Sequence, residues 1–326
     1  MGSRPGRLAA LTLLLVAIPW LLPQRYFLRV LDLGLVYALL ALGLQLLVGS
    51  AGQLSLGHAA FYGTGAYTSA ILARKLAAPV EVSFLAGGVV AALLALTLVP
   101  ILRLRGNELA VATLGFGVIV HAVILNEEWL TEGPFGMMRI PPFRLGPLSF
   151  DTEFRFYYLG LAVVALTYFA FRRLTRSRFG RALEAIRQSE EAAVTSGIDP
   201  LRYKSKVFVI AAFTAGLAGG LFAHLNRYLN PNDFTLAESI NILVMIVVGG
   251  LRSLEGAIAG ALLIVFTSEY FRAFKEYRLI FFGAALVLLM ALGADGVRGL
   301  PTKLLAVARG WSGPVQPGPA AEPGDD

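Results

Sequence analysis

Long apolar runs separated by short polar loops make up most of the chain, and this pattern predicts an all-α polytopic membrane protein. A helix needs about 20 residues to cross a hydrocarbon core of about 30 Å. We expect about ten spans in a single transmembrane domain over residues 1–309, followed by a disordered Pro/Gly tail at 310–326. The expected spans are Leu8–Leu22, Leu31–Val48, Gly49–Leu72, Val82–Leu102, Leu109–Leu125, Phe156–Phe171, Val207–Leu225, Ile240–Val248, Gly256–Phe271 and Leu279–Gly293.

The first and the eighth of these apolar runs differ from an ordinary membrane span. The first run has the length of a secretory signal, but Pro23 follows it in place of a small-residue cleavage site, so we interpret it as a span. The eighth run is short and is expected to borrow residues 236–239. A weak internal similarity links Val48-Gly49 and Gly57 with Val248-Gly249 and Gly256.

The longest polar interruption is the segment 172–206, which lies between the sixth and seventh runs. It opens with several arginines and continues as an expected helix over residues 181–193. Phe179, Leu183, Ile186 and Ala193 recur at helical spacing and predict one apolar stripe. Glu184 with Gln188, and Arg187 with Glu191, are expected pairs on the polar side.

This predicted helix ends in a corner. Gly197 suits the left-handed residue that closes a helix, and Asp199-Pro200 has the form of an N-cap followed by proline at the first helical position. A second helix therefore begins there and enters the membrane. Two interpretations of the amphipathic helix remain open. It either lies on lipid headgroups, held by its arginines, or it docks into a soluble partner.

The third expected span is rich in glycine and small residues, which let helix backbones approach closely. Ser55, His58 and Tyr62 fall on one face if the whole stretch is helical. Polar groups inside a membrane either line a path or form hydrogen bonds between helices. The candidates for a substrate path are Gln45, Gln53, Ser55, His58, Tyr62, Thr113 and Asn241.

Composition supports a membrane protein, since hydrophobic residues are 56%, charged residues are 15% and the mean hydropathy is +0.69. Lys and Arg gather in loops, and we place segment 172–206 and both termini in the cytoplasm of a bacterium, with the chain in its plasma (inner) membrane. The chain has no cysteine, which excludes disulfides and thiolate sites. No charged residue is placed in the middle of a span, which argues against transport driven by protons or sodium through a buried carboxylate.

The sequence contains no nucleotide-binding or metal-binding motif. It has no Gly-Lys dipeptide and hence no P-loop, so any ATP is bound by another chain and no cofactor is expected here. The three histidines lie on separate spans and form no metal-ligand spacing. If the chain takes part in transport that consumes ATP, another chain therefore hydrolyses it, and we expect no enzymatic activity here.

Several motifs resemble one family. Residues Gly52-Gln-Leu-Ser-Leu-Gly57-His-Ala-Ala-Phe61 are similar to the signature that opens a core helix in the LivH/LivM permeases of branched-chain amino acid importers. Glu191-Ala192-Ala193 with Gly197 resembles the EAA loop of importer permeases. Thr131-Glu-Gly-Pro-Phe-Gly136 resembles an outer loop of LivM-type subunits, with Glu132 in place of the usual first glycine.

This resemblance implies a LivM-type permease subunit of an ABC importer for branched-chain amino acids. The implied partners are a LivH-type permease, two cytoplasmic ABC ATPases and an external substrate-binding protein. The residues implied to couple transport to the ATPases are Phe179, Leu183, Ile186, Glu190, Glu191, Ala192, Ala193 and Gly197.

The residues themselves leave alternatives open. A path lined by small and apolar groups suits a compact substrate with an apolar side chain, but it equally suits urea or a short amide. A membrane-embedded enzyme or an assembly scaffold is a hypothesis of another class. An enzyme needs a clustered acid/base or metal set, and a scaffold does not need a glycine-rich core.

Overall fold

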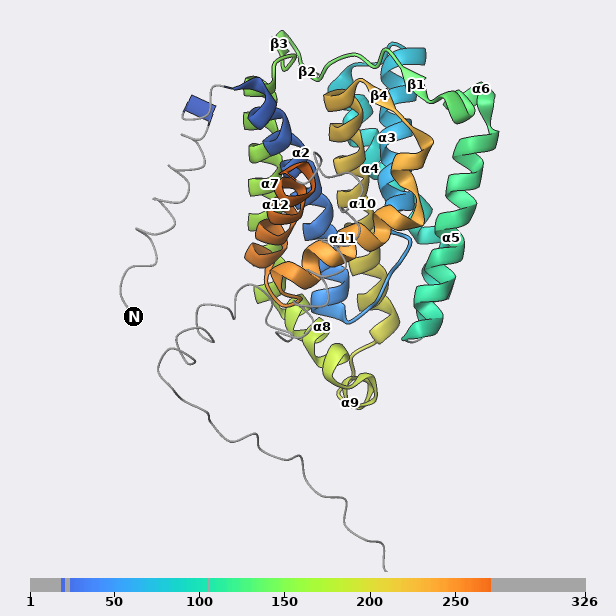
Figure 1. The fold of residues 1–326 in the computed structure, drawn as a ribbon. Coiled ribbons are helices and arrows are strands. Elements are labelled where there is room, and N and C mark those ends of the chain that lie inside the picture. The colour runs from blue at the N-terminus through green and yellow to red at the C-terminus, as the bar shows by residue number, and fades with distance from the viewer. Residues whose placement is uncertain (1–18, 21–23, 105, 271–326) are drawn as a thin grey trace, which may run out of the picture.

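The computed structural model describes residues 19–20, 24–104 and 106–270, which form a bundle of helices with short two-residue strands at one end (Figure 1). The tail at 310–326, the expected last span and all but two residues of the expected first span lie outside this part of the chain. Five described helical segments are long and apolar enough to cross a membrane. They are Arg25–Ser50, Val80–Thr97, Asn107–Asn126, Glu153–Arg176 and Pro200–Asn226.

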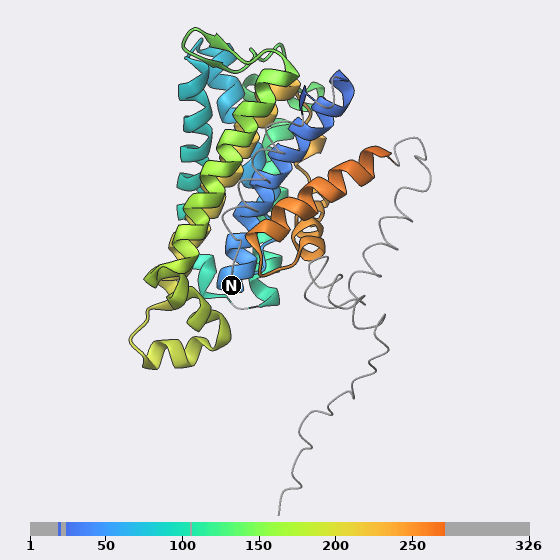
Figure 2. The same ribbon diagram turned by 90° about the vertical axis from the view of Figure 1, so that its left-hand side faces the viewer.

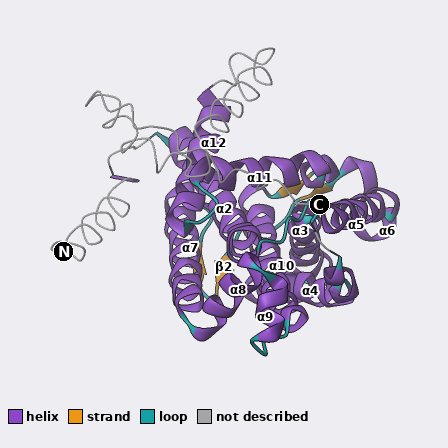
Figure 3. Cartoon of the chain, turned by 90° about the horizontal axis from the view of Figure 1, so that it is seen from below, coloured by secondary structure: helices purple, strands orange, loops and turns teal. Residues whose placement is uncertain are grey.

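Two of these segments form the centre of the bundle. α2 (Arg25–Gln45) continues as a π-helix over Leu46–Ser50, and α10 (Pro200–Asn226) packs beside it; most of both is buried. Seen from below in Figure 3, α5 lies on one flank while α7 and α12 lie on the other, with α3 and α10 between them. The remaining long helices are α3 (His58–Lys75), α4 (Val80–Thr97), α5 (Asn107–Asn126), α7 (Glu153–Arg176), α11 (Leu236–Gly249) and α12 (Leu254–Tyr270).

Glycines bring α3, α4 and α10 into backbone contact. A Cβ on Gly65 of α3 would lie 2.2 Å from the Gly216 carbonyl of α10, and a Cβ on Gly87 of α4 would lie 2.6 Å from the Gly65 carbonyl. No larger residue fits at these points without separating the helices. This close approach at Gly65, Gly87 and Gly216 is the small-residue interface that membrane bundles favour.

The two ends of the bundle differ. One end carries α6 (Glu128–Thr131), the turn Gly133–Phe135 and the strand pairs β1 (Met137–Met138) with β4 (Tyr228–Leu229) and β2 (Arg144–Leu145) with β3 (Leu148–Ser149). The other end carries α8 (Arg178–Gln188) and α9 (Glu190–Thr195), which Figure 2 shows projecting beyond α7. We call these the strand end and the elbow end.

α11 and α12 are joined by a short turn and pack against each other. The expected extension of the eighth run is confirmed, since α11 begins at Leu236. The turn after Gly249 packs on the π-helix, where Gln45 donates a hydrogen bond from Nε2 to the Leu251 carbonyl. A Cβ on Gly49 would lie 2.2 Å from that same carbonyl. The two similar glycine-rich turns noted in the sequence thus touch each other.

Candidate functional site

The chain unwinds between α2 and α3. Gly52 adopts φ +69°, and the Gly52 and Gln53 amides bond back to the Val48 and Leu47 carbonyls, which ends the π-helix. The amides of residues 54–57 donate no helical hydrogen bonds, and α3 starts at His58. The expectation that Ser55 shares a helical face with His58 and Tyr62 is therefore wrong, because Ser55 precedes the helix.

This unwound segment, residues 52–57, extends into the interior of the bundle. The His58 ring hydrogen-bonds to the Leu40 carbonyl of α2. Leu40 lies ten residues before Ser50, which corresponds to a helical rise of about 15 Å. α3 therefore begins well inside the bundle rather than at the elbow end. Irregular backbone at such depth is tolerated where it is buried in protein or lines a cavity.

Side chains from two other helices hold the unwound segment. The Leu56 amide donates to Thr113 Oγ1 of α5 at 3.0 Å, and Thr113 Oγ1 donates in turn to the Ala110 carbonyl. The Ala59 amide donates to Ser239 Oγ of α11 at 2.9 Å. These bonds satisfy donors that an interrupted helix leaves open, and they fix the start of α3 between α5 and α11.

Several buried polar atoms of this region have no hydrogen-bond partner in the described part of the chain. They are both side-chain amide atoms of Gln53, Ser55 Oγ, His58 Nε2 and the Tyr62 hydroxyl. An unsatisfied buried polar group costs about 1–3 kcal/mol, so such a concentration marks a place where a polar ligand or water can supply the missing partners. We take the unwound segment with His58 and Tyr62 as the candidate site.

The other expected path residues are placed differently. Thr113 belongs to the site through its bond to Leu56. Gln45 is buried but faces the turn between α11 and α12, and Asn241 is partly exposed on α11. His121 and His224 lie on other helices, and no group of side chains suited to a metal ion occurs among the described residues.

Sequence reasoning missed Asp32. This side chain is fully buried in α2, and neither carboxylate oxygen has a hydrogen-bond partner among the described residues. Asp32 is the eighth residue of α2, near the strand end, so the expectation that no charged residue lies in the middle of a span stays a prediction. The pattern did not reveal the burial of Asp32 because an acidic residue at the start of an apolar run ordinarily remains in water.

The elbow follows local rules at most of its corners. Ser177 caps α8 by accepting from the Phe179 amide, Gly197 has φ +78°, and Asp199 caps α10 by accepting from the Arg202 amide. The predicted left-handed glycine and N-cap are thus confirmed. The single helix expected over residues 181–193 is instead broken at Ser189, whose hydroxyl accepts from the Ala192 amide and starts α9.

The apolar stripe of the elbow is covered by the chain itself. Leu183, Ile186 and Ala193 are buried at 0%, 4% and 2% exposure, and Phe179 stacks on Tyr203 of α10. The residues expected to contact the ATPases therefore fall into two groups. The apolar stripe is buried, whereas Glu191, Ala192 and Gly197 are exposed together with Val194. Glu190 forms an ion pair with Lys204 of α10 at 2.8 Å.

Arg187 joins the elbow to the candidate site. Its Nη1 donates to the Gly49 carbonyl at 2.6 Å, rather than pairing with Glu191 as expected, and its aliphatic stem lies against Gly52. Gly49 belongs to the π-helix, and Gly52 begins the unwound segment. A cavity of about 290 Å³ lies between this part of the chain and the elbow, lined by Gln53 and Lys204 among others.

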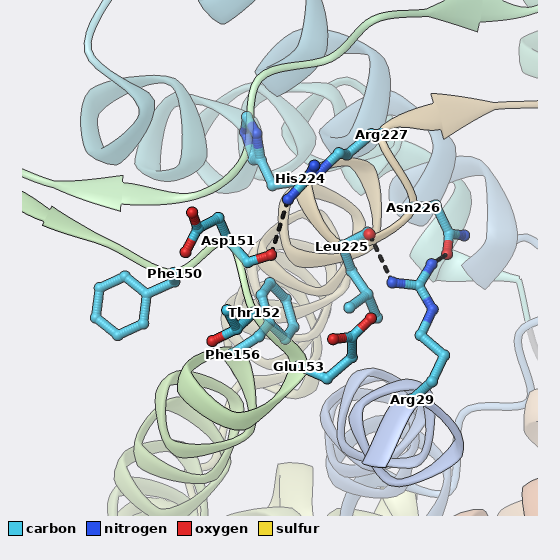
Figure 4. A pocket seen from close by; sticks show the side chains of 10 residues that line it. All are labelled: Arg29, Phe150, Asp151, Thr152, Glu153, Phe156, His224, Leu225, Asn226 and Arg227. Atoms are coloured by element: carbon cyan, nitrogen blue, oxygen red, sulfur yellow. Dashed lines mark hydrogen bonds between the residues drawn. The ribbon is translucent and has the colours of Figure 1, made fainter. Parts of the chain in front are cut away.

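A second cavity, of about 250 Å³, lies at the strand end (Figure 4). Its guanidinium groups are engaged by the chain itself. Arg29 donates to the Leu225 carbonyl at 2.8 Å and to Asn226 Oδ1 at 2.5 Å, and Arg227 donates to the Asp151 carbonyl at 2.9 Å. These hydrogen bonds connect the ends of α2, α7 and α10, so we interpret them as structural contacts that hold the three helices together.

Comparison with known proteins gives a consistent picture. The family model described as "branched-chain amino acid transport system / permease component" matches residues 26–290. The chain is 35% identical to the high-affinity branched-chain amino acid transport system permease protein LivM of Salmonella typhimurium, over 89% of this chain and 74% of that protein.

LivM of Escherichia coli is 36% identical, over 93% of this chain and 77% of the relative. The permease protein LivH of Salmonella typhimurium is 26% identical, over 82% of this chain and 93% of that protein. No solved structure matches the chain significantly.

Proposed function

Since the chain belongs to the family of permease components of branched-chain amino acid transport systems, we propose that it carries branched-chain amino acids across the bacterial plasma membrane as one permease subunit of an ABC importer. The observation that carries this proposal is the unwound segment with its buried, unpartnered polar groups inside a bundle of apolar helices. Interrupted helices near the middle of the membrane are where transporters bind their substrates.

The chemistry of the site suits a zwitterion with an apolar side chain. The amino-terminal end of α3 carries the positive end of a helix dipole, which favours the substrate carboxylate. Gln53, Ser55 and the His58 ring offer further hydrogen bonds. Phe61 and Phe116, whose ring centroids lie 5.4 Å apart, supply apolar surface close to this end of α3.

The partners follow from this role. A LivH-type permease completes the membrane part, two ATPases bind and hydrolyse ATP, and an external binding protein delivers the substrate. The elbow end faces the cytoplasm and the strand end faces outward. Both termini then lie inside, and the chain itself has no ATPase site, in agreement with the absence of a P-loop from its sequence.

Coupling runs through the outer face of the elbow. An ATPase would contact Glu191, Ala192 and Val194, because the apolar stripe of α8 is already covered. Movement of α9 reaches α10 through the ion pair of Glu190 with Lys204, and movement of α8 reaches the π-helix through Arg187. Transport requires the ATPase to bind the two states of this elbow with different free energies.

The test is ATP-driven uptake of radiolabelled leucine by the whole importer in proteoliposomes. Ser55→Ala should lower uptake about tenfold. The buried Ser55 hydroxyl has no hydrogen-bond partner in the described fold, so in this proposal it binds the substrate, and its loss removes that contact. Thr64→Ala is the matched control, because the Thr64 hydroxyl bonds only to the Ala60 carbonyl of its own helix at 2.8 Å.

Two results would overturn the proposal. Uptake of urea or acetamide in preference to leucine would assign the chain to another substrate class. Equal uptake by the wild-type and Ser55→Ala proteins would remove the unwound segment from the path. Purification of the chain without any associated ATPase would instead favour a scaffold or a channel.

A further inference from the structure

A third cavity, of about 490 Å³, lies at the elbow end and is larger than the two above. It lies on the α7 side of the bundle, whereas α5 lies on the opposite side. It is bordered by the last turns of α7, one side of α8, the π-helix and the turn between α11 and α12. Arginines from three separate elements line it. They are Arg172, Arg176, Arg181, Arg187 and Arg252, accompanied by the two carboxylates of Glu184 and Glu255.

The two carboxylates are already engaged by the chain. Glu184 accepts from Gln188 at 3.3 Å and lies 3.8 Å from Arg187. Glu255 accepts from the Tyr168 hydroxyl at 2.7 Å. Arg187 partly offsets the charge of Glu184, and the five arginines outnumber the two carboxylates, so the cavity keeps an excess of positive charge.

Three of the arginines, by contrast, have open donors. In the part of the chain that the structure describes, no hydrogen bond or ion pair engages the guanidinium groups of Arg172, Arg176 or Arg252. Each guanidinium carries several N–H donors in a fork that matches two oxygens of a phosphate. Arg172 and Arg252 come from different elements and line the same cavity, so an anion bound there can be contacted from both sides.

The surroundings point to a lipid as the source of that anion. Immediately above the cavity, α7 presents exposed apolar side chains, with Leu166 at 73% and Phe169 at 56% exposure. These residues lie on the same helix as Arg172 and Arg176, three to ten residues closer to its start and therefore farther from the elbow end. An acyl chain can therefore follow α7 while its headgroup reaches the arginines.

We propose that this cavity binds the phosphodiester headgroup of an anionic phospholipid from the leaflet at the elbow end, between the arginines of α7 and Arg252. Basic pockets between transmembrane helices are suited to such headgroups. The lipid would bridge α7 and the turn after α11, and it would sit against Arg187 and Gly49, which link the elbow to the unwound segment. The site is independent of the transported substrate.

The experiment measures lipid binding to the purified permease complex by native mass spectrometry, with phosphatidylglycerol compared with phosphatidylcholine. The double variant R172Q/R252Q should lower phosphatidylglycerol affinity about tenfold or more, since each charge near a headgroup contributes to binding. R173Q/R178Q is the matched control. It removes two exposed arginines of α7 and α8 that do not line the cavity, and its affinity should change less than about twofold.

R172K/R252K keeps the charge and should retain most of the binding, which separates a binding defect from misfolding. Equal loss in R172Q/R252Q and R173Q/R178Q would show non-specific attraction and overturn the proposal. Binding of inorganic phosphate by calorimetry without a preference for phosphatidylglycerol would assign the cavity to a soluble anion and overturn the lipid source. Loss of lipid on adding the ATPase subunits would show that a protein occupies the cavity, and would overturn it as well.

Discussion

Lys204 Nζ lies 2.8 Å from Glu190 Oε2, in an ion pair between α9 and the first turns of α10. Lys204 is 7% exposed, so this ammonium group has little access to water. The pair explains why the elbow does not continue as one helix. Ser189 breaks the helix, and the new first turn brings Glu190 toward α10.

Glu190→Gln should destabilise the protein by about 1–3 kcal/mol, because it leaves a nearly buried ammonium group without its counter-charge. The measurement is thermal unfolding of the purified complex in detergent. The double variant E190Q/K204M should recover most of the loss, since it removes both charges. A double variant as unstable as the sum of the two single variants would show that the pair itself contributes nothing.

Glu132 offers a test of the loop at the strand end. It has φ +68°, a conformation that costs a non-glycine residue about 1–2 kcal/mol, and its carboxylate forms an ion pair with Arg74 that is roughly one-third exposed. A pair exposed to this degree contributes at most about 1 kcal/mol. Glu132→Gly should therefore leave stability unchanged or raise it by up to about 1 kcal/mol.

Glu132→Ala is the comparison, since it loses the ion pair without relieving the backbone. It should unfold at a lower temperature than both the wild-type protein and Glu132→Gly. If alanine proved at least as stable as glycine, the left-handed conformation of this residue would not be the controlling factor.

Local chemistry in the sequence was enough to place the corners of the elbow. Gly197 and Asp199-Pro200 act through their own backbone conformation and their nearest amides, so their roles do not depend on distant residues. The apolar runs likewise predicted a helical membrane protein, since burial of apolar surface in lipid follows from length and composition alone. The number of about ten spans stays a prediction.

The unwound segment could not be placed in this way. Its helical periodicity continues through Ser55, but the start of α3 is decided by Thr113 and Ser239, which lie far away in the sequence. The same limit applies to the stripe of α8. The sequence pattern shows that Leu183 and Ile186 must be buried against some surface. Only the packing of the folded chain shows that this surface belongs to the chain itself.

Thr113→Val should lower uptake strongly while the complex still assembles. The substitution keeps the shape of the side chain but leaves the Leu56 amide without its acceptor, at a cost of about 1–3 kcal/mol to the unwound segment. Thr113→Ser keeps the hydroxyl and should retain transport. The measurement is leucine uptake normalised to the amount of assembled importer, and equal activity of the valine and serine variants would contradict this role.

Arg187→Gln should separate ATP hydrolysis from transport. The bond from Arg187 to the Gly49 carbonyl is charge-assisted, and such bonds contribute about 1.5–3 kcal/mol. Because the elbow reaches the π-helix through this contact, its loss should lower leucine uptake about tenfold while the ATPases continue to turn over. Arg178→Gln is the control, since Arg178 lies on the same helix with its side chain exposed.

The ratio of leucine transported to ATP hydrolysed distinguishes coupling from stability. A variant that is only less stable would lose both activities in proportion, and the ratio would stay constant. A ratio that falls in Arg187→Gln and not in Arg178→Gln would place Arg187 between the elbow and the unwound segment. An unchanged ratio would mean that motion passes instead through another contact between the elbow and α10, such as the ion pair of Lys204 with Glu190.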